Sequence, residues 1–248
     1  MTECNFNFQG ANFVVTGASS GIGRQITKEL AAAGARVLAI ARRGELLEQI
    51  HLENPLITPA VLDMTDYEKL ENTIKEFTEK YGKIDGGVHA AGITDLTVLK
   101  VYDEAQVKHI MDVNYWSAVK FLQILSRPVT VQKGASFVLF SSIAVEYGFS
   151  GLFAYTSAKA ALEAAVRTFA KELAPRKIRI NAIRPGIVDT SMTKDENVAE
   201  AVARYVANTP LGMGKTDDIS GAVMFLLSCR SRWITGSIFN VDGGYSGA

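Results

Sequence analysis

The sequence predicts one α/β domain, built on a doubly wound parallel sheet with helices on both faces. Short apolar runs alternate with longer amphipathic stretches along the whole chain, and the runs are apolar throughout instead of at every second residue. Such runs are typical of strands buried on both faces of a parallel sheet. The 248 residues suit one large α/β domain or two small ones. No repeat, low-complexity segment or linker divides them, which favours one domain.

The predicted elements follow one another in a regular order. The expected strands span residues 11–17, 35–41, 58–63, 86–92, 134–142, 178–186 and 236–244. The expected helices span residues 23–34, 66–82, 103–126 and 154–174. The helix at 66–82 begins with an aspartate and ends with a glycine, which are common helix-boundary residues.

The composition excludes several classes of function. Lys plus Arg and Asp plus Glu number 26 each, so the net charge is zero and neither nucleic acid nor an anionic membrane is favoured as a partner. Two cysteines, Cys4 and Cys229, and three scattered histidines indicate neither a disulfide framework nor a metal site. The polar start "MTECNFNFQG" does not resemble a signal peptide, and no apolar run approaches the roughly 18 residues of a membrane helix. We therefore expect a cytoplasmic protein.

The segment "TGASSGIG" places Gly17, Gly21 and Gly23 between the first strand and the first helix. Glycines permit a tight turn with positive φ and leave room for a ligand, and the N-terminus of a helix attracts a pyrophosphate. The spacing is GxxxGxG, not the common GxGxxG of dinucleotide-binding loops. Glycines also serve turns alone. The position after the first strand of an alternating β/α chain favours a dinucleotide.

The segment "YTSAK" places Tyr155 four residues before Lys159 on a predicted helix, so the two side chains share one face. A nearby ammonium lowers the pKa of a phenol from about 10 and favours acid–base catalysis near neutral pH. Ser142 ends the fifth predicted strand, and its hydroxyl can stabilise charge on a carbonyl oxygen. Ser141 is an alternative for this role. These residues indicate acid–base chemistry at the carboxyl edge of the sheet, where ligands bind in this architecture.

Three motifs together, "TGASSGIG", "YTSAK" and "NAIRPG", resemble those of the short-chain dehydrogenase/reductase family in order and spacing. The resemblance covers nearly the whole chain and is most similar to reductases of the 3-ketoacyl-(acyl-carrier-protein) type. It implies one Rossmann domain over residues 1–248, with a short substrate lid at about 191–210. It also implies a homotetramer, with the helices at 103–126 and 154–174 in the interface.

The resemblance also implies the roles of individual residues. The implied catalytic residues are Asn114, Ser142, Tyr155 and Lys159. Asn114 is expected to hold a water beside the lysine in a proton relay, with backbone bonding inside its helix as the alternative. The implied cofactor-binding residues are Gly17, Ser19, Ser20, Gly21, Ile22, Gly23, Arg42, Arg43, Asp63, Met64, Ala90, Ala91, Gly92, Tyr155, Lys159, Pro185, Gly186, Val188 and Thr190. His89 stands where the family usually has asparagine, and we interpret it as a core histidine.

The end of the second predicted strand bears on the choice of cofactor. Ala41 occupies the position where NAD-preferring relatives tend to carry aspartate, and Arg42 follows it. A guanidinium binds phosphate oxygens in a bidentate fork, so NADP(H) is favoured over NAD(H). Arg42 and Arg43 alternatively begin a solvated helix. Ser20 is a departure, because many NADP-dependent relatives have a basic residue there.

The leading hypothesis is an NADPH-dependent reductase of a small carbonyl compound, with a 3-ketoacyl thioester as one candidate substrate. One alternative is an NAD-dependent alcohol or sugar dehydrogenase working in the oxidative direction. Another is a non-catalytic dinucleotide-sensing protein. Four apolar side chains near the expected lid either line a substrate pocket or serve packing: Tyr147, Phe149, Phe153 and Met192.

Overall fold

A seven-stranded parallel sheet forms the centre of the computed structural model, which describes residues 5–194 and 199–247. The strand order is β3-β2-β1-β4-β5-β6-β7. The strands are β1 (Asn12–Thr16), β2 (Arg36–Ala41), β3 (Ile57–Val61), β4 (Ile84–His89), β5 (Val131–Phe140), β6 (Arg179–Pro185) and β7 (Ile238–Val241). The predicted fold class is confirmed, with strand ends that differ by a few residues. The order of the strands reverses between β1 and β4, and this is the switch point at which doubly wound sheets bind ligands.

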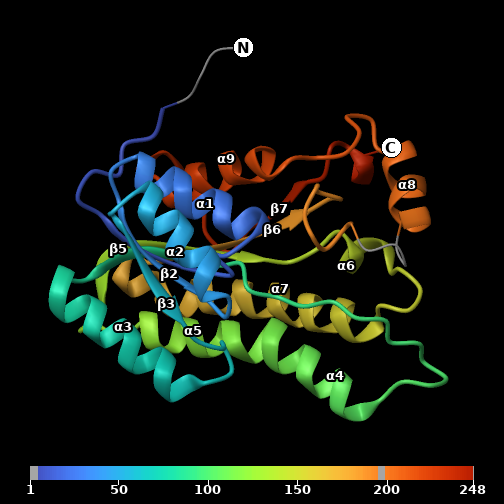
Figure 1. Ribbon diagram of the computed structural model, residues 1–248, viewed down its shortest axis with the longest axis horizontal. Coiled ribbons are helices and arrows are strands. Elements are labelled where there is room, and N and C mark those ends of the chain that lie inside the picture. The colour runs from blue at the N-terminus through green and yellow to red at the C-terminus, as the bar shows by residue number, and fades with distance from the viewer. Residues whose placement is uncertain (1–4, 195–198, 248) are drawn as a thin grey trace.

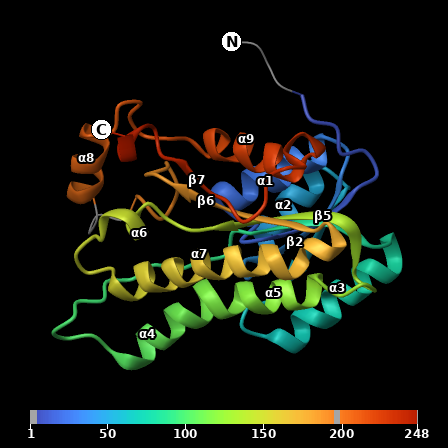
Figure 2. The same cartoon turned by 180° about the vertical axis from the view of Figure 1, so that it is seen from behind.

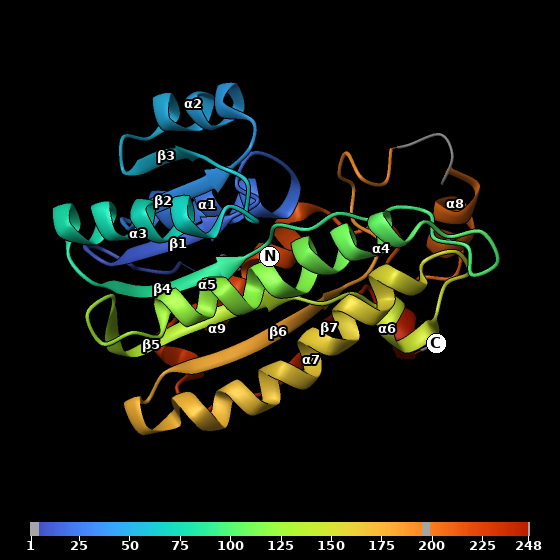
Figure 3. The same cartoon turned by 90° about the horizontal axis from the view of Figure 1, so that it is seen from below.

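Helices cover both faces of the sheet (Figure 1). One face carries α1 (Gly21–Ala32), α2 (Gly44–Glu53) and α9 (Thr216–Leu227). The other carries α3 (Tyr67–Tyr81), α4 (Glu104–Met111), α5 (Ser117–Leu125) and α7 (Phe153–Leu173). The short helices α6 (Ala144–Tyr147) and α8 (Ala199–Ala207) lie beyond the carboxyl ends of the strands (Figure 3). The sequence pattern did not predict α6, α8 or α9, and α2 was expected only as the alternative in which Arg42 and Arg43 begin a helix.

The core consists of two apolar clusters, one on each face of the sheet. Along β1, Phe13 and Val15 belong to one cluster and Val14 to the other, because successive strand residues point to opposite faces. All three are almost completely buried. Each such side chain contributes roughly 1.5–3 kcal/mol by leaving water, which explains why the strands are apolar throughout.

The helix predicted at 103–126 is one helical run with an irregular centre. α4 and α5 are joined by a π-helical turn, Asp112–Trp116, and α4 runs beside α7 (Figure 2). Such turns widen a helix locally and often occur at functional sites. This one contains Asn114. The helix predicted from residue 66 begins as expected, since Asp66 Oδ1 accepts a hydrogen bond from Lys69 N–H at 3.1 Å.

Two properties of residues 5–194 and 199–247 bear on the function. No helix in these ranges is long and apolar enough to cross a bilayer. In the same ranges, no group of three or more His, Cys, Asp or Glu side chains is arranged to hold a metal ion.

Candidate active site

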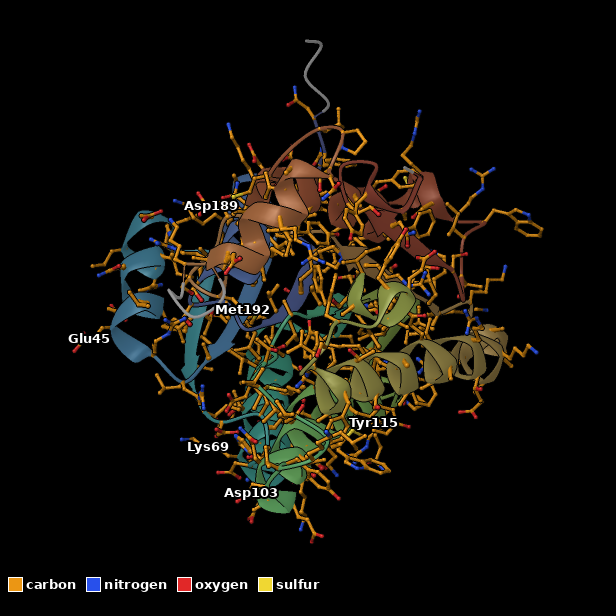
Figure 4. All side chains as sticks on the ribbon, turned by 90° about the vertical axis from the view of Figure 1, so that its right-hand side faces the viewer. Glu45, Lys69, Asp103, Tyr115, Asp189 and Met192 are labelled. Carbon is orange, nitrogen blue, oxygen red and sulfur yellow. The ribbon has the colours of Figure 1, made fainter. Side chains whose placement is uncertain are left out.

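A pocket of about 380 Å³ lies at the carboxyl edge of the sheet, beside the switch point. Many of the predicted cofactor-binding residues line it. They are Gly17, Ser19, Ser20, Gly21, Ile22, Gly23, Arg42, Arg43, Asp63, Met64, Ala90, Ala91, Gly92 and Thr190. The pocket thus joins the ends of four strands to the segment after β6, on which Figure 4 labels Asp189 and Met192.

The sequence reasoning did not place six other residues in this lining. They are Ala41, Leu62, Ile93, Val113, Ser191 and Met192. Four of them directly adjoin a predicted contact in the sequence, and Met192, which was considered only for a substrate pocket, is two residues from Thr190, so extending each motif by one or two residues would have found them. Val113 is next to Asn114, which was predicted for catalysis only.

The glycine loop is shaped by close backbone contacts. Gly17 has φ +67°, and a Cβ there would lie 2.7 Å from the carbonyl oxygen of Ala90. A Cβ at Gly23 would lie 2.4 Å from the carbonyl oxygen of Gly17. Thr16 Oγ1 accepts a hydrogen bond from Ala91 N–H at 3.1 Å and so joins the ends of β1 and β4. The N-terminus of α1 therefore faces the pocket with little side-chain bulk in between, as an anion site requires.

Arg43, more than Arg42, covers the glycine loop. Its guanidinium donates to Ser19 Oγ at 3.1 and 3.2 Å and also to Ser20 Oγ. Arg42 Nη1 instead lies 3.7 Å from Asp63 Oδ2. Partial burial raises the pKa of Asp63, but hydrogen bonds from Thr65 and the charge of Arg42 outweigh it, so the pKa is lowered overall. Both arginines are exposed at the pocket rim.

Ser142, Tyr155 and Lys159 come together beside this pocket. Ser142 follows β5, and the other two lie one turn apart on α7. Lys159 is 3% exposed; its Nζ donates to the carbonyl oxygen of Phe140 at 2.9 Å and lies 5.7 Å from the centroid of the Tyr155 ring. A Cβ on Gly92, in the pocket lining, would lie 3.5 Å from Lys159 Nζ. The lysine therefore adjoins the pocket.

Burial dominates the ionisation of these two side chains. It lowers the pKa of Lys159 to about 8. It raises the pKa of Tyr155, and the neighbouring Ser142 hydroxyl offsets only part of this rise. The expected lowering of the tyrosine pKa by Lys159 is therefore not what the structure shows. The sequence reasoning considered the charge of the lysine and left out the cost of moving a phenolate away from water.

Asn114 is completely buried in the π-helical turn. Its Nδ2 donates to the carbonyl oxygens of Ile93 at 2.8 Å and Ile110 at 2.9 Å, and its Oδ1 accepts from Ile93 N–H at 3.3 Å. The backbone bonding expected as the alternative is therefore present. A Cβ on Gly92 would lie 2.8 Å from Asn114 Oδ1, so this oxygen also adjoins the pocket lining. The relay role remains a prediction.

The segment after β6 approaches the pocket from the opposite side. Gly186 N–H donates to the carbonyl oxygen of Val241 at 3.0 Å, and the carbonyl oxygen of Val188 accepts from Thr193 Oγ1 at 2.9 Å. Thr190 lies against Gly21, where a Cβ would be 3.3 Å from its Cγ2. Of the predicted contacts, Tyr155, Lys159, Pro185, Gly186 and Val188 lie outside the lining of this pocket. Residues 195–198 of the expected lid lie outside the described residues.

Most of the apolar side chains considered for a substrate pocket contact other aromatic rings. Tyr147 packs edge-on against Tyr245, Phe149 against Tyr205, and Phe153 against Tyr102. Tyr205, on α8, also stacks on Tyr245 at a centroid distance of 3.9 Å. Met192 lines the pocket described above.

His89 is buried at the end of β4, and its Nε2 lies 2.9 Å from Ser117 Oγ. Burial, with a further contribution from the charge of Lys159, lowers the pKa of His89 to about 3. The ring packs edge-on against Phe121. These contacts agree with its interpretation as a core histidine.

A doubly wound sheet with a glycine loop at its switch point defines the class of NAD(P)-dependent oxidoreductases with a Rossmann fold. Comparison with known proteins identifies the family. The family model described as enoyl-(acyl carrier protein) reductase matches residues 17–246. The chain belongs to the short-chain dehydrogenase/reductase family and is an NAD(P)-dependent enzyme.

Two similar proteins and one solved structure illustrate the relationship. The chain is 33% identical to a 3-oxoacyl-[acyl-carrier-protein] reductase FabG of Thermotoga maritima, over 95% of this chain and 98% of the relative. It is also 33% identical to carbonyl reductase [NADPH] 2 of Sus scrofa, over 96% and 98%. A solved short-chain dehydrogenase/reductase of Brucella melitensis, described as a glucose/ribitol dehydrogenase, is 28% identical with a TM-score of 0.92, over 98% of this chain and 99% of that chain. These relatives support an NAD(P)-dependent carbonyl reductase.

Proposed function

We propose that the protein reduces the carbonyl group of a small ketone to an alcohol with NADPH, and that Tyr155 is the general acid. The observation that carries this proposal is the position of Lys159. Its buried Nζ lies 5.7 Å from the Tyr155 ring centroid and adjoins the pocket through Gly92. A buried ammonium beside a phenol serves proton transfer better than it serves stability, because burying its charge is costly.

The residues divide the chemistry between them. A bound nicotinamide supplies the hydride for the new carbon–hydrogen bond. The raised pKa of Tyr155 keeps its phenol protonated, which is the form a general acid needs, until it gives the proton to the carbonyl oxygen. Lys159 carries its charge below pH about 8 and stabilises the phenolate that this transfer leaves. Ser142 donates to the same oxygen, and Asn114 supports the proton supply to the lysine.

The remaining predicted contacts would hold the cofactor. The glycine loop fits a pyrophosphate, because a side chain at Gly17 or Gly23 would collide with backbone. We propose that Asp63 and Met64 contact the adenine and that the segment Ala90–Gly92 lies against the adenosine ribose. On the other side, Tyr155 and Lys159 would bind the nicotinamide ribose. The loop residues Pro185, Gly186, Val188 and Thr190 would bind the nicotinamide.

We propose NADP(H) over NAD(H), with Arg43 joining Arg42 at the 2′-phosphate. The Arg43 guanidinium already donates to Ser19 and Ser20 at the rim of the glycine loop. A phosphate there would complete a cluster of guanidinium and hydroxyl groups, which suits phosphate recognition. The name of one relative, carbonyl reductase [NADPH] 2, agrees with this preference.

For the substrate we propose a ketone, with a 3-ketoacyl thioester foremost, in line with the name of the Thermotoga relative. We further propose a lid at about 191–210, a cytoplasmic location and a homotetramer built on α4, α5 and α7. Two observations support this interface: Trp116 is 50% exposed, and the groove beside it is lined partly by Val119, Phe169 and Leu173. The second candidate is an NAD-dependent alcohol or sugar dehydrogenase working in the oxidative direction, and the name of the Brucella relative, glucose/ribitol dehydrogenase, supports the sugar as substrate.

The consumption of NADPH and of NADH should be measured against an acetoacetyl thioester, a β-keto ester, a diketone and a keto-sugar. We expect NADPH-dependent reduction of one class and a loss of at least about a hundredfold in kcat for Tyr155→Phe, since one proton-transfer group supplies 10²–10⁴-fold. NADPH binding should be retained in this variant. Full turnover by Tyr155→Phe would contradict the catalytic assignment. A preference for NAD and a sugar alcohol would establish the second candidate.

A further inference from the structure

Glu163 is a buried carboxylate on α7, one turn beyond Lys159 and 4% exposed. It is held from two directions. The Arg184 guanidinium donates to both of its oxygens, with Nε to Oε1 and Nη2 to Oε2 each at 2.6 Å. Ser141 Oγ donates to Oε1 at 2.5 Å. Every oxygen of this buried carboxylate is thus paired, as a buried charge requires.

Glu163 and its two partners come from the three parts of the chain that carry the proposed catalytic machinery. Ser141 immediately precedes Ser142 at the end of β5. Glu163 is on the same helix as Tyr155 and Lys159. Arg184, near the end of β6, directly precedes Pro185, where the loop proposed to bind nicotinamide begins. The carboxylate therefore lies where the two strand ends meet the helix.

The backbone reinforces the same junction. Ser141 N–H donates to the carbonyl oxygen of Ile183 at 2.8 Å, and Ile143 N–H donates to that of Pro185 at 3.3 Å. Backbone bonds fix β5 against β6. The bonds to Glu163 tie both strands to the helix through side chains, beside the bond from Lys159 Nζ to the carbonyl oxygen of Phe140 on β5 alone.

A second acidic residue extends the network outward. Arg184 Nη1 lies 3.0 Å from Glu146 Oε2, on α6, and Asn240 Nδ2 donates to the same oxygen at 3.2 Å. Asn240 is the register partner of Arg184 across β6 and β7. The guanidinium thus joins α6, α7 and β7, and its planar fork fixes the directions of these contacts.

We propose that Glu163 and Arg184 form a positioning pair, which sets the distance between Ser142 and Tyr155 and the approach of the loop that begins at Pro185. This inference rests on the proposed function, because it assigns the pair to the same catalytic groups. A buried ion pair adds little stability compared with apolar residues of similar volume. Misplacement of reacting groups by about 1 Å can cost 100-fold in rate, so this pair should affect the rate of hydride transfer more than cofactor binding.

The test uses Glu163→Gln in the full chain, with Glu71→Gln as the matched control. Glu71 also accepts two hydrogen bonds from one arginine, Arg127, but on α3 and outside the pocket lining. For Glu163→Gln we expect kcat on the best ketone of the panel to fall about 10- to 100-fold. The Kd for NADPH should change less than about threefold. With NADPH deuterated at the transferred position, the isotope effect on kcat should rise, because misaligned groups slow the chemical step. Glu71→Gln should change neither kcat nor the isotope effect.

A second variant, which disturbs the network less, tests the proposal if Glu163→Gln does not fold. Ser141→Ala removes one hydrogen bond and keeps the ion pair, and we expect a twofold to fivefold loss in kcat with a fall of a few degrees in Tm, because a hydrogen bond to a buried charged group contributes to stability. The proposal is overturned if Glu163→Gln lowers only the Tm and matches Glu71→Gln in kcat, or if Ser141→Ala keeps full kcat. Tyr155→Phe, measured in the same assay, distinguishes failure of the proposed function from failure of the positioning pair. If Tyr155→Phe stays active, the catalytic assignment fails, whatever the result for Glu163→Gln.

Discussion

The two halves of the sheet build their parts of the site in different ways. From β3 to β4, the half proposed to bind the cofactor (the cofactor half) relies on close backbone approach, as at Gly17, where a Cβ would lie 2.7 Å from the carbonyl oxygen of Ala90. From β5 to β7, the half proposed for catalysis (the catalytic half) relies on two buried charged side chains, Lys159 and Glu163, the second of which pairs with the half-buried Arg184. The geometry of the cofactor half depends on glycines, which have no side chain. The geometry of the catalytic half depends on which charged side chains form pairs. The two halves should therefore respond differently to substitution.

The largest effect is expected for Gly23→Ala, which should disable the cofactor half alone. The new methyl group would lie 2.4 Å from the carbonyl oxygen of Gly17, so the loop must move away from the N-terminus of α1. We expect the Kd for NADPH, measured by fluorescence titration, to rise at least about 50-fold, which corresponds to about 2.3 kcal/mol.

Gly221→Ala is the matched control for this substitution. Gly221 also lies in a helix, α9, but among the described residues no atom outside its own stretch of helix backbone and its chain neighbours lies within 4 Å of its added Cβ. Unchanged NADPH affinity and a gain of about 0.5–1 kcal/mol in the free energy of unfolding are expected. Tight NADPH binding by Gly23→Ala would show that the loop has room that its backbone contacts do not indicate.

An intermediate effect is expected for Arg43→Ala, which tests how the cofactor half recognises a phosphate. Arg43 contacts the glycine loop, whereas Arg42 lies beside Asp63. We expect the Kd for NADPH to rise about tenfold, as loss of a charge-assisted contact predicts, and the Kd for NADH to stay within twofold. Arg42→Ala should have the smaller effect on NADPH. An equal loss of both cofactors would mean that Arg43 supports the loop and does not bind the 2′-phosphate.

The last effect concerns stability instead of cofactor binding and lies at the boundary between the halves, at His89 on β4. The pKa of this histidine is lowered from 6.5 to about 3 in the folded state. Between these values the unfolded chain binds a proton that the folded chain does not, so the free energy of unfolding falls as the pH drops below 6.5. The expected loss at pH 5 is about 2 kcal/mol. In urea denaturation, His89→Asn should show a shallower pH dependence over this range, and identical slopes for both proteins would contradict the assignment.

The two halves also differ in how well sequence reasoning anticipated them. In the cofactor half, the glycine loop and the residues at each strand end were found because each is a local pattern beside an apolar run. The lining residues that were missed, such as Leu62 and Ile93, are apolar and have no distinctive pattern. In the catalytic half, the spacing of Tyr155 and Lys159 was found, but the direction of the tyrosine pKa shift was wrong because it depends on burial.

The sequence by itself determined the alternation of strands and helices, the position of the glycine loop and the shared helix face of Tyr155 and Lys159. These features follow from the periodicity and sterics of a few neighbouring residues. Only the tertiary structure decided that Arg43 covers the loop, that the Asn114 amide bonds to backbone, and that Glu163 pairs with Arg184. Each of these contacts joins residues about 20 or more positions apart in the chain, and its energy depends on how deeply the residues are buried. A local sequence pattern shows neither the distant partner nor the burial.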